Sequence, residues 1–157
     1  MFSICCRVCM KRLAVVVCLL VSIVSVQLKA AEKNYGNVVV AEVISIYDAD
    51  TFRVNIGGWP DIIGKRISIR VSGVDAPEIR GKCKAEKQAA RQAKQFTVGA
   101  LRAARQIELR NMQRGKYFRI LADVYIDGED LATSLIKAKH ARPYDGGTRK
   151  GWCAGKL

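Results

Sequence analysis

The chain has 157 residues, of which half are hydrophobic, so it is not a disordered or fibrous protein. Lysine and arginine number 27 against 14 acidic residues, and the formal net charge of +13 favours a polyanionic partner over a cationic one. The single histidine, His140, argues against sites that need two histidines, whether for acid–base hydrolysis or for zinc.

The first thirty residues have the pattern of an export signal. Three basic residues precede an uncharged stretch over 13–28, and Ala30 places a small residue where a signal peptidase would cleave. We therefore expect residues 1–30 to be a cleavable signal peptide and the protein to be exported, to a periplasm or out of the cell. An uncleaved anchor is the alternative, but this stretch is shorter than the ~20 residues that a helix needs to span a membrane.

Residues 31–157 are expected to form a single domain, which keeps only two cysteines, Cys83 and Cys153. An exported protein meets an oxidising compartment, so we expect these two residues to form a disulfide. On the chain-entropy model, a bridge that closes a loop of about 70 residues contributes ~4 kcal/mol to stability. Two free, buried thiols are the alternative.

The predicted elements begin with three strands. The stretch 38–47 is almost continuously apolar and β-branched, which predicts a strand buried on both faces. Apolar and polar side chains alternate over 51–56, and a turn rich in glycine follows this second strand. The third strand is expected over 66–74, with Arg70 projecting from the face opposite the aliphatic side chains.

The hydrophobic period then changes to that of a helix. Apolar residues recur at helical spacing from residue 86 onward, at Ala89, Ala93, Phe96, Ala100, Leu101 and Ala104. This spacing predicts an amphipathic helix. Short strands are expected at 106–111 and 119–126, and a second helix at 131–139 after a turn. The order of three strands, helix, two strands and helix favours an α+β, mainly β fold: a five-stranded OB-type barrel with two to three helices.

Three short segments carry side chains suited to chemistry. The first, Asp-Ala-Asp-Thr at 48–51, joins two strands and offers two carboxylates to a hard cation, although acidic turn residues are usually just solvated. The second, 70–78, ends in a proline-containing turn that brings Asp75 close to Glu78, and its alternative is an ordinary capped turn. The third, 116–119, is basic and aromatic, and its alternative is a solvated hairpin.

Taken together, these segments resemble the motifs of the staphylococcal nuclease, or thermonuclease, family. The family pattern is Asp-Gly-Asp-Thr, then Arg-x-x-x-x-Asp-x-Pro-Glu, then Tyr-Gly-Arg. This chain has Asp48-Ala49-Asp50-Thr51, residues 70–78 at the same internal spacing, and Tyr117-Phe118-Arg119. The similarity covers about residues 38–144, and the stretches 142–147 and 151–153 are similar to those of exported bacterial members.

The resemblance implies a Ca²⁺-dependent endonuclease that hydrolyses phosphodiester bonds in DNA and RNA with little sequence specificity and leaves 3′-phosphate ends. By the same resemblance, Asp50 and Asp75 bind Ca²⁺ with the backbone carbonyl of Ala76 as a third ligand. Water and substrate phosphate complete the six to eight oxygens that Ca²⁺ takes. Asp48 is expected near the ion but outside its ligand shell.

The resemblance also assigns catalytic roles. Glu78 is the general base for the attacking water; because a glutamate near its ordinary pKa of ~4.3 is a weak base for water, the metal must activate that water or Glu78 mainly positions it. Arg70 and Arg119 hold the phosphoryl oxygens as charge develops in the transition state. The expected contacts to the rest of the substrate come from Lys116, Tyr117 and Tyr144.

Two residues depart from the family pattern. Ala49 replaces the glycine between the two aspartates, which matters only if the backbone there needs a positive φ. Phe118 replaces the glycine before Arg119, and its ring would either re-aim the arginine or offer a base a stacking surface. Neither change removes a reacting group.

The distribution of charge supports a nucleic-acid substrate. Residues 80–105 hold eight basic side chains against Glu86 alone, which is either a phosphate-binding track or a solvated helix face. The alternative function is a catalytically silent OB-fold nucleic-acid-binding protein, since a fold does not fix a function. The complete set of carboxylates and arginines favours the nuclease, because carboxylates without a cation would repel phosphates. We expect a monomer without stable membrane association, and a structural or solvent-facing His140.

Overall fold

The computed structural model describes residues 33–153. Its elements are β1 (Val38–Asp48), β2 (Thr51–Ile56), α2 (Asp61–Gly64), β3 (Ile67–Val71), β4 (Val74–Asp75), α3 (Lys84–Ala103), β5 (Ile107–Arg114), β6 (Ile120–Ile126), β7 (Glu129–Asp130), α4 (Leu131–Lys137) and β8 (Arg142–Pro143). The predicted signal peptide, 1–30, lies outside the described residues. Within 33–153, no helix has the length and apolar character needed to cross a membrane.

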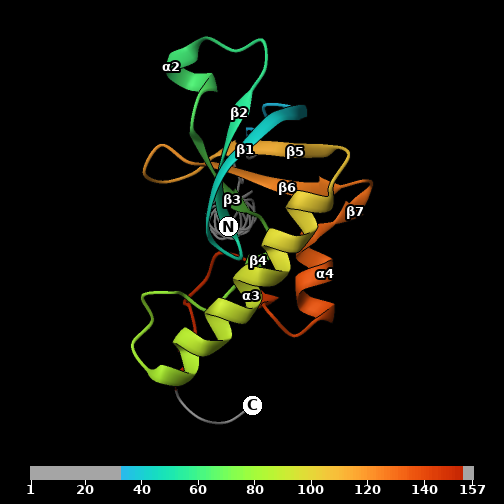
Figure 1. The fold of residues 1–157 in the computed structure, drawn as a ribbon. Helices are drawn as coiled ribbons and strands as arrows, with labels where there is room; N and C mark the ends of the chain where they lie inside the picture. The colour runs from blue at the N-terminus through green and yellow to red at the C-terminus, as the bar shows by residue number, and fades with distance from the viewer. Residues whose placement is uncertain (1–32, 154–157) are drawn as a thin grey trace, which may run out of the picture. The chain divides into compact units, whose positions relative to one another are not determined.

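Five strands close into a mixed β-barrel (Figure 1). Antiparallel pairing joins β3 to β2, β2 to β1, β1 to β5 and β5 to β6. The barrel closes through parallel pairing of β3 with β6, which sets Arg70 opposite Leu121. The predicted OB-type barrel, mainly β with helices, is therefore confirmed, as is the order of its main elements.

The barrel interior holds the core. Along β2 and β3, alternate side chains point inward, so that Phe52, Val54 and Ile69 are fully buried while Arg70 projects from the other face. This placement of Arg70 is the one predicted from the alternation of apolar and polar residues. The predicted third strand is shorter than expected, because Gly73 adopts a φ of 75° and turns the chain between β3 and β4.

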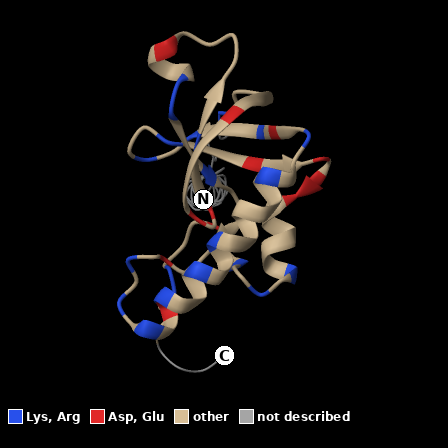
Figure 2. Cartoon of the chain, viewed as in Figure 1, with Lys and Arg blue, Asp and Glu red and all other residues tan. Residues whose placement is uncertain are grey.

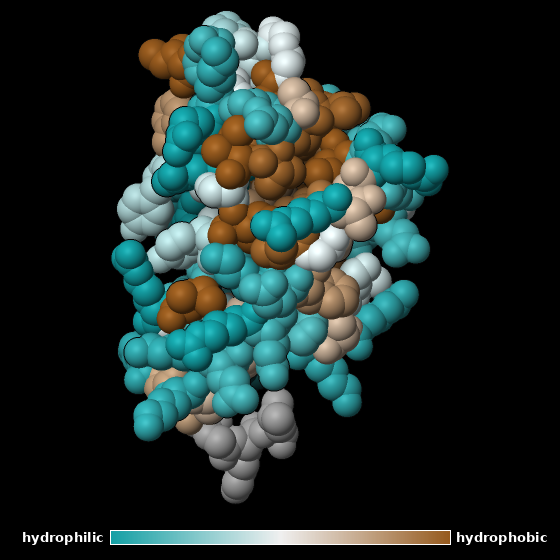
Figure 3. All heavy atoms as spheres, viewed as in Figure 1, coloured by the Kyte–Doolittle hydropathy of each residue, from teal (hydrophilic) through white to brown (hydrophobic). Residues whose placement is uncertain are grey.

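The expectation that the first strand is buried on both faces is wrong. Val39 and Tyr47 remain 52% and 48% exposed, Ala41 is exposed too, and the other apolar residues of β1 are only partly buried. One face of β1 covers the barrel interior, and among the described residues α3 is the helix that packs on the other. A groove lined by Val43, Ile46 and Lys94 lies between β1 and α3. Figure 3 shows apolar side chains gathered where β1 crosses this face.

Helix α3 packs across the barrel and fixes the turn between β1 and β2. Its buried face includes Ala93, Thr97 and Leu101, and the Thr97 hydroxyl donates to the Ala49 carbonyl at 2.8 Å. Basic side chains recur along α3 and along the loop before it (Figure 2). Helix α4 is capped by Asp130, and the half-buried His140 that follows it packs against Phe96 with ring centroids 5.2 Å apart.

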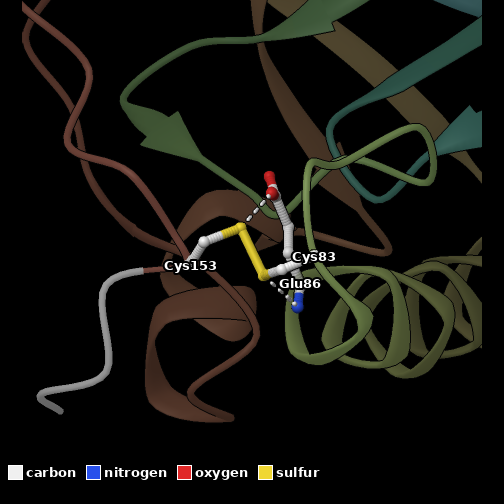
Figure 4. Close-up of side chains that lie close together, drawn as sticks. All are labelled: Cys83, Glu86 and Cys153. Atoms are coloured by element: carbon white, nitrogen blue, oxygen red, sulfur yellow. Dashed lines mark hydrogen bonds between the residues drawn. A yellow bond between two sulfur atoms is a disulfide. The ribbon is translucent and has the colours of Figure 1, made fainter.

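A disulfide joins the start of α3 to the C-terminal segment (Figure 4). Cys83 and Cys153 have Cα atoms 5.8 Å apart and are separated by 70 positions in the sequence. Glu86 supports the bridge: its backbone amide donates to the Cys83 sulfur at 3.5 Å, and its carboxylate accepts from the Lys82 amide at 3.0 Å. The pairing expected from the two remaining cysteines is present in the structure.

Removing this bridge should lower the melting temperature. A bridge that closes a loop of this length raises the free energy of the unfolded chain by ~4 kcal/mol, so we expect reduction to lower Tm by roughly 10 °C or more. Calorimetry with and without reductant measures the shift, and a Cys83→Ser/Cys153→Ser variant provides the control, since its Tm must not respond to reductant. An unchanged Tm in the reduced wild-type protein would show that the bridge does not stabilise the fold.

Candidate active site

The turn between β1 and β2 holds two aspartates in a fixed position. Asp50 is 1% exposed, and Asp48 accepts a hydrogen bond from the Ile79 amide at 3.1 Å. Thr97 anchors the intervening residue, Ala49, through its carbonyl. The φ of Ala49 is not positive, so the alanine fits the backbone and its departure from the family's glycine introduces no strain.

Asp50 connects two of the predicted motifs. The register between β2 and β3 places Thr51 opposite Arg70, and the Arg70 guanidinium forms an ion pair with Asp50 at 2.5 Å. The other carboxylate oxygen of Asp50 accepts from the Ala76 amide at 3.1 Å, while Arg70 also donates to the Val74 carbonyl at 3.3 Å. The turn at 48–51 and the segment 70–78 therefore form one site.

Burial controls the electrostatics of this site. Desolvation raises the pKa of Asp48 and of Asp50, and for Asp50 it outweighs the opposing effects of Arg70 and the Ala76 amide. Desolvation also lowers the pKa of Arg70. Burial therefore disfavours the charged forms of both aspartates by more than Arg70 offsets, and an additional cation beside their oxygens would favour the charged forms.

Asp75 lies in a second cluster of charged groups. Pairing of β4 with β8 sets Asp75 opposite Arg142, whose Nε and Nη2 donate to Asp75 Oδ2 at 3.1 and 2.9 Å. The Trp152 indole donates to the same oxygen at 3.1 Å. Arg149 Nε lies 3.4 Å from Asp75 Oδ1, and Arg149 Nη1 lies 2.7 Å from Glu78 Oε1. A single guanidinium therefore bridges the predicted metal ligand and the predicted base.

Arg149 was not predicted from the sequence, because no motif marks it. The expected disulfide could have indicated it: a bridge between Cys83 and Cys153 brings the residues just before Cys153 close to those just before Cys83. Arg142 and Trp152 were part of the sequence similar to exported family members, but no contact with Asp75 was expected of them.

The donor set suits a hard cation. Asp50 and Asp75 offer carboxylate oxygens, the type of ligand that Ca²⁺ prefers, and the Ala76 amide bond to Asp50 keeps the two close. In residues 33–153, the one trio of ligand side chains whose donor atoms all lie within 4.8 Å is Cys83, Glu86 and Cys153, and the disulfide engages both of its sulfurs. A cation at the aspartates would therefore have two carboxylate ligands, with backbone carbonyl and water oxygens completing the shell.

The third predicted motif lies in the loop between β5 and β6. Tyr117 and Phe118 are 88% and 55% exposed, with φ values of 55° and 59°. Arg119 Nε donates to the Lys116 carbonyl at 3.3 Å, and its charge contributes to lowering the pKa of Arg70, after the larger effect of burial. Among the described residues, Arg119 forms no ion pair with a carboxylate, so it lies near the site without joining its network.

Phe118 offers a stacking surface that is already used within the protein. The Arg114 guanidinium lies 4.0 Å from the centroid of its ring. Tyr144, the remaining predicted substrate contact, follows β8 and donates from its hydroxyl to the Gly147 carbonyl at 2.7 Å. Tyr144 lines a cavity together with Asp75 and Arg142, whereas Tyr117 lies in the separate β5–β6 loop.

A model of the family described as staphylococcal nuclease homologue matches residues 68–150, more than half of the chain. The protein belongs to the staphylococcal nuclease family. No curated protein matches the chain. The family match includes Arg70, Asp75, Glu78 and Arg119 but not the turn at 48–51, so the contact of Asp50 with Arg70 is what joins this turn to the nuclease-family segment.

We expect Asp48→Asn to stabilise the metal-free nuclease-family domain. Burial raises the pKa of Asp48 above the 3.8 of an unfolded chain, so its charged form destabilises the fold once the pH rises through the raised pKa. Asparagine removes that charge and keeps an acceptor for the Ile79 amide. The variant should therefore unfold at a higher urea concentration than the wild type at pH 7 in chelator. The difference between the two urea midpoints should narrow as the pH falls toward 4.

Glu129→Gln is the matched control, since Glu129 is exposed. It should change the urea midpoint little at either pH. An Asp48→Asn protein that is less stable than the wild type at pH 7 would contradict the assigned effect of burial.

Proposed function

We propose that the protein is an exported, Ca²⁺-dependent endonuclease that cleaves DNA and RNA with little sequence specificity and leaves 3′-phosphate ends. The observation that carries this proposal is the contact between Asp50 and Arg70, with the Ala76 amide on the other oxygen of Asp50. It puts oxygen ligands for a hard cation beside a guanidinium that fits phosphate. The excess of basic residues agrees with a polyanionic substrate.

Asp50, Asp75 and the Ala76 carbonyl are the residues that would hold Ca²⁺. When bound, the ion would offset phosphate charge and make a water molecule more acidic. The protein's own groups do the remaining work: Arg70 and Arg119 bind the non-bridging phosphate oxygens, and they bind most strongly as charge grows in the transition state. A third group, Glu78, is half-exposed, so that its carboxylate can accept a hydrogen bond from water.

In the proposed reaction the water oxygen forms a bond to phosphorus and the bond from phosphorus to the 5′ oxygen breaks. The water proton passes to Glu78, and the leaving 5′ oxygen takes a proton from solvent. The products are a 3′-phosphate and a 5′-hydroxyl. No covalent intermediate with the protein is required.

The rest of the substrate would bind along the basic surface. Seven of the eight basic residues over 80–105 lie on α3 and the loop before it (Figure 2), and Arg105 follows the helix. Lys116 adds a charge beside the exposed ring of Tyr117. Charge contacts of this kind give binding that weakens with salt and does not depend on sequence, while tyrosines stack on bases. Tyr144, which lines a cavity with Asp75, would provide a second stacking group.

The proposed location follows from two features. The predicted signal peptide would direct the chain to export, and the disulfide between Cys83 and Cys153 is of the kind that persists in oxidising compartments. We propose that the exported domain works as a monomer without stable association with a membrane.

Glu78→Gln and Arg119→Ala should each lower kcat/KM by at least ~100-fold, because each removes a group that acts in the transition state. Glu78 is half-exposed and Arg119 lies in the loop before β6, so the fold should be retained in both variants. The matched controls Glu129→Gln and Arg53→Ala alter exposed residues outside the site and should keep wild-type rates.

The assay is digestion of single-stranded DNA, duplex DNA and RNA with Ca²⁺, with Mg²⁺ and with chelator, followed by end-group analysis. Fragments with 3′-phosphate ends that form only with Ca²⁺ support the proposal. Near-wild-type rates in either site variant would refute the assigned roles. Tight, salt-sensitive binding of DNA without cleavage under any metal would identify a silent OB-fold nucleic-acid-binding protein instead.

A further inference from the structure

The segment after β8, residues 144–153, is a strap that is fixed at both ends. At its start, the Tyr144 amide donates to the Gly73 carbonyl at 3.0 Å, and at its end Cys153 is bonded to Cys83 (Figure 4). Arg142 also donates to the Lys150 carbonyl. These attachments hold the strap beside β4, so that Arg149 reaches the carboxylates of Asp75 and Glu78.

The two oxygens of Asp75 are occupied in different ways. Oδ2 accepts hydrogen bonds from Arg142 and Trp152. The Arg142 guanidinium also stacks on the Trp152 indole, 4.2 Å from the ring centroid. Within residues 33–153, the ion pair of Oδ1 is the one with Arg149 Nε, at 3.4 Å. A divalent cation that used Asp75 as a ligand would therefore approach through Oδ1 and would meet the guanidinium of Arg149 there.

Arg149 can leave this position more easily than Arg142. Its side chain is 42% exposed and comes from the strap rather than from a strand, whereas Arg142 lies in β8, paired with β4. Arginine keeps its charge in proteins, so the Arg149 guanidinium that faces Asp75 and Glu78 is a permanent cation. Two cations thus compete for one carboxylate oxygen.

We propose that Arg149 is the resident cation of the metal site, which neutralises Asp75 and Glu78 in the metal-free protein and must release Asp75 Oδ1 before a divalent ion binds. Arg149 therefore sets the Ca²⁺ concentration at which the site fills. When displaced, its guanidinium is free beside Glu78, where substrate phosphate arrives. This inference rests on the proposed function, because it assumes that Asp75 is a metal ligand.

The test is calorimetric titration of Ca²⁺ alone into the chelator-treated, disulfide-bonded protein. Arg149→Gln removes the competing charge, and we expect its Kd for Ca²⁺ to be about fivefold lower than that of the wild type, the fold-change that corresponds to ~1 kcal/mol for a partly exposed ion pair. Lys150→Gln is the matched control. It removes the same charge from the next position of the strap, and within residues 33–153 the Lys150 side chain makes no ion pair. Its Kd should stay within about twofold of the wild type.

The outcomes separate this inference from the proposed function. A wild-type protein that binds and cleaves with Ca²⁺, while Arg149→Gln binds Ca²⁺ equally or more weakly, overturns the inference and leaves the nuclease intact. An equal gain in Lys150→Gln also overturns it, because the effect would then be one of overall charge. A wild-type protein that neither binds Ca²⁺ nor cleaves overturns both.

Discussion

The buried carboxylate of Asp50 imposes the conditions that the rest of the site satisfies. A carboxylate that is 1% exposed is destabilising unless it is paired and hydrogen-bonded. The fold supplies both: the register of β2 on β3 delivers Arg70, and the turn after β4 delivers the Ala76 amide. Because β3 is also paired with β6, Arg70 stands on a strand held at both edges and cannot move away without opening the barrel.

The arginines of the site fall into two groups according to the elements that carry them. Arg70 and Arg142 lie on paired strands and each binds an aspartate that is almost fully buried. Arg119 comes from a loop and donates to a backbone carbonyl, and Arg149 comes from the strap and contacts the buried Asp75 and the half-exposed Glu78. The strand arginines thus fix the carboxylates. Under the proposed function, the other two would release their present partners when substrate phosphate or a metal ion binds.

The sequence was informative where one physical pattern determined the local structure. Alternation fixed β2 and the orientation of Arg70, and the 3.6-residue period located α3 to within a few residues. It failed for β1, because an apolar run does not reveal whether another element covers its second face. It also missed the break at Gly73, where a single positive φ ends the strand. Arg149 was beyond any local pattern, since its position depends on the path of the chain between two cysteines.

The loop before β6 shows how a departure from the family pattern is accommodated. Both Tyr117 and Phe118 adopt a left-handed backbone, which costs a residue other than glycine about 1 kcal/mol or more. The Arg114 guanidinium packs on the Phe118 ring, and the Arg119 guanidinium lies 5.6 Å from the centroid of the Tyr117 ring. These contacts offset part of the strain and hold Arg119 beside Arg70 rather than against a carboxylate. Within residues 33–153, Arg119 thus has no carboxylate partner, and a guanidinium without one can bind phosphate.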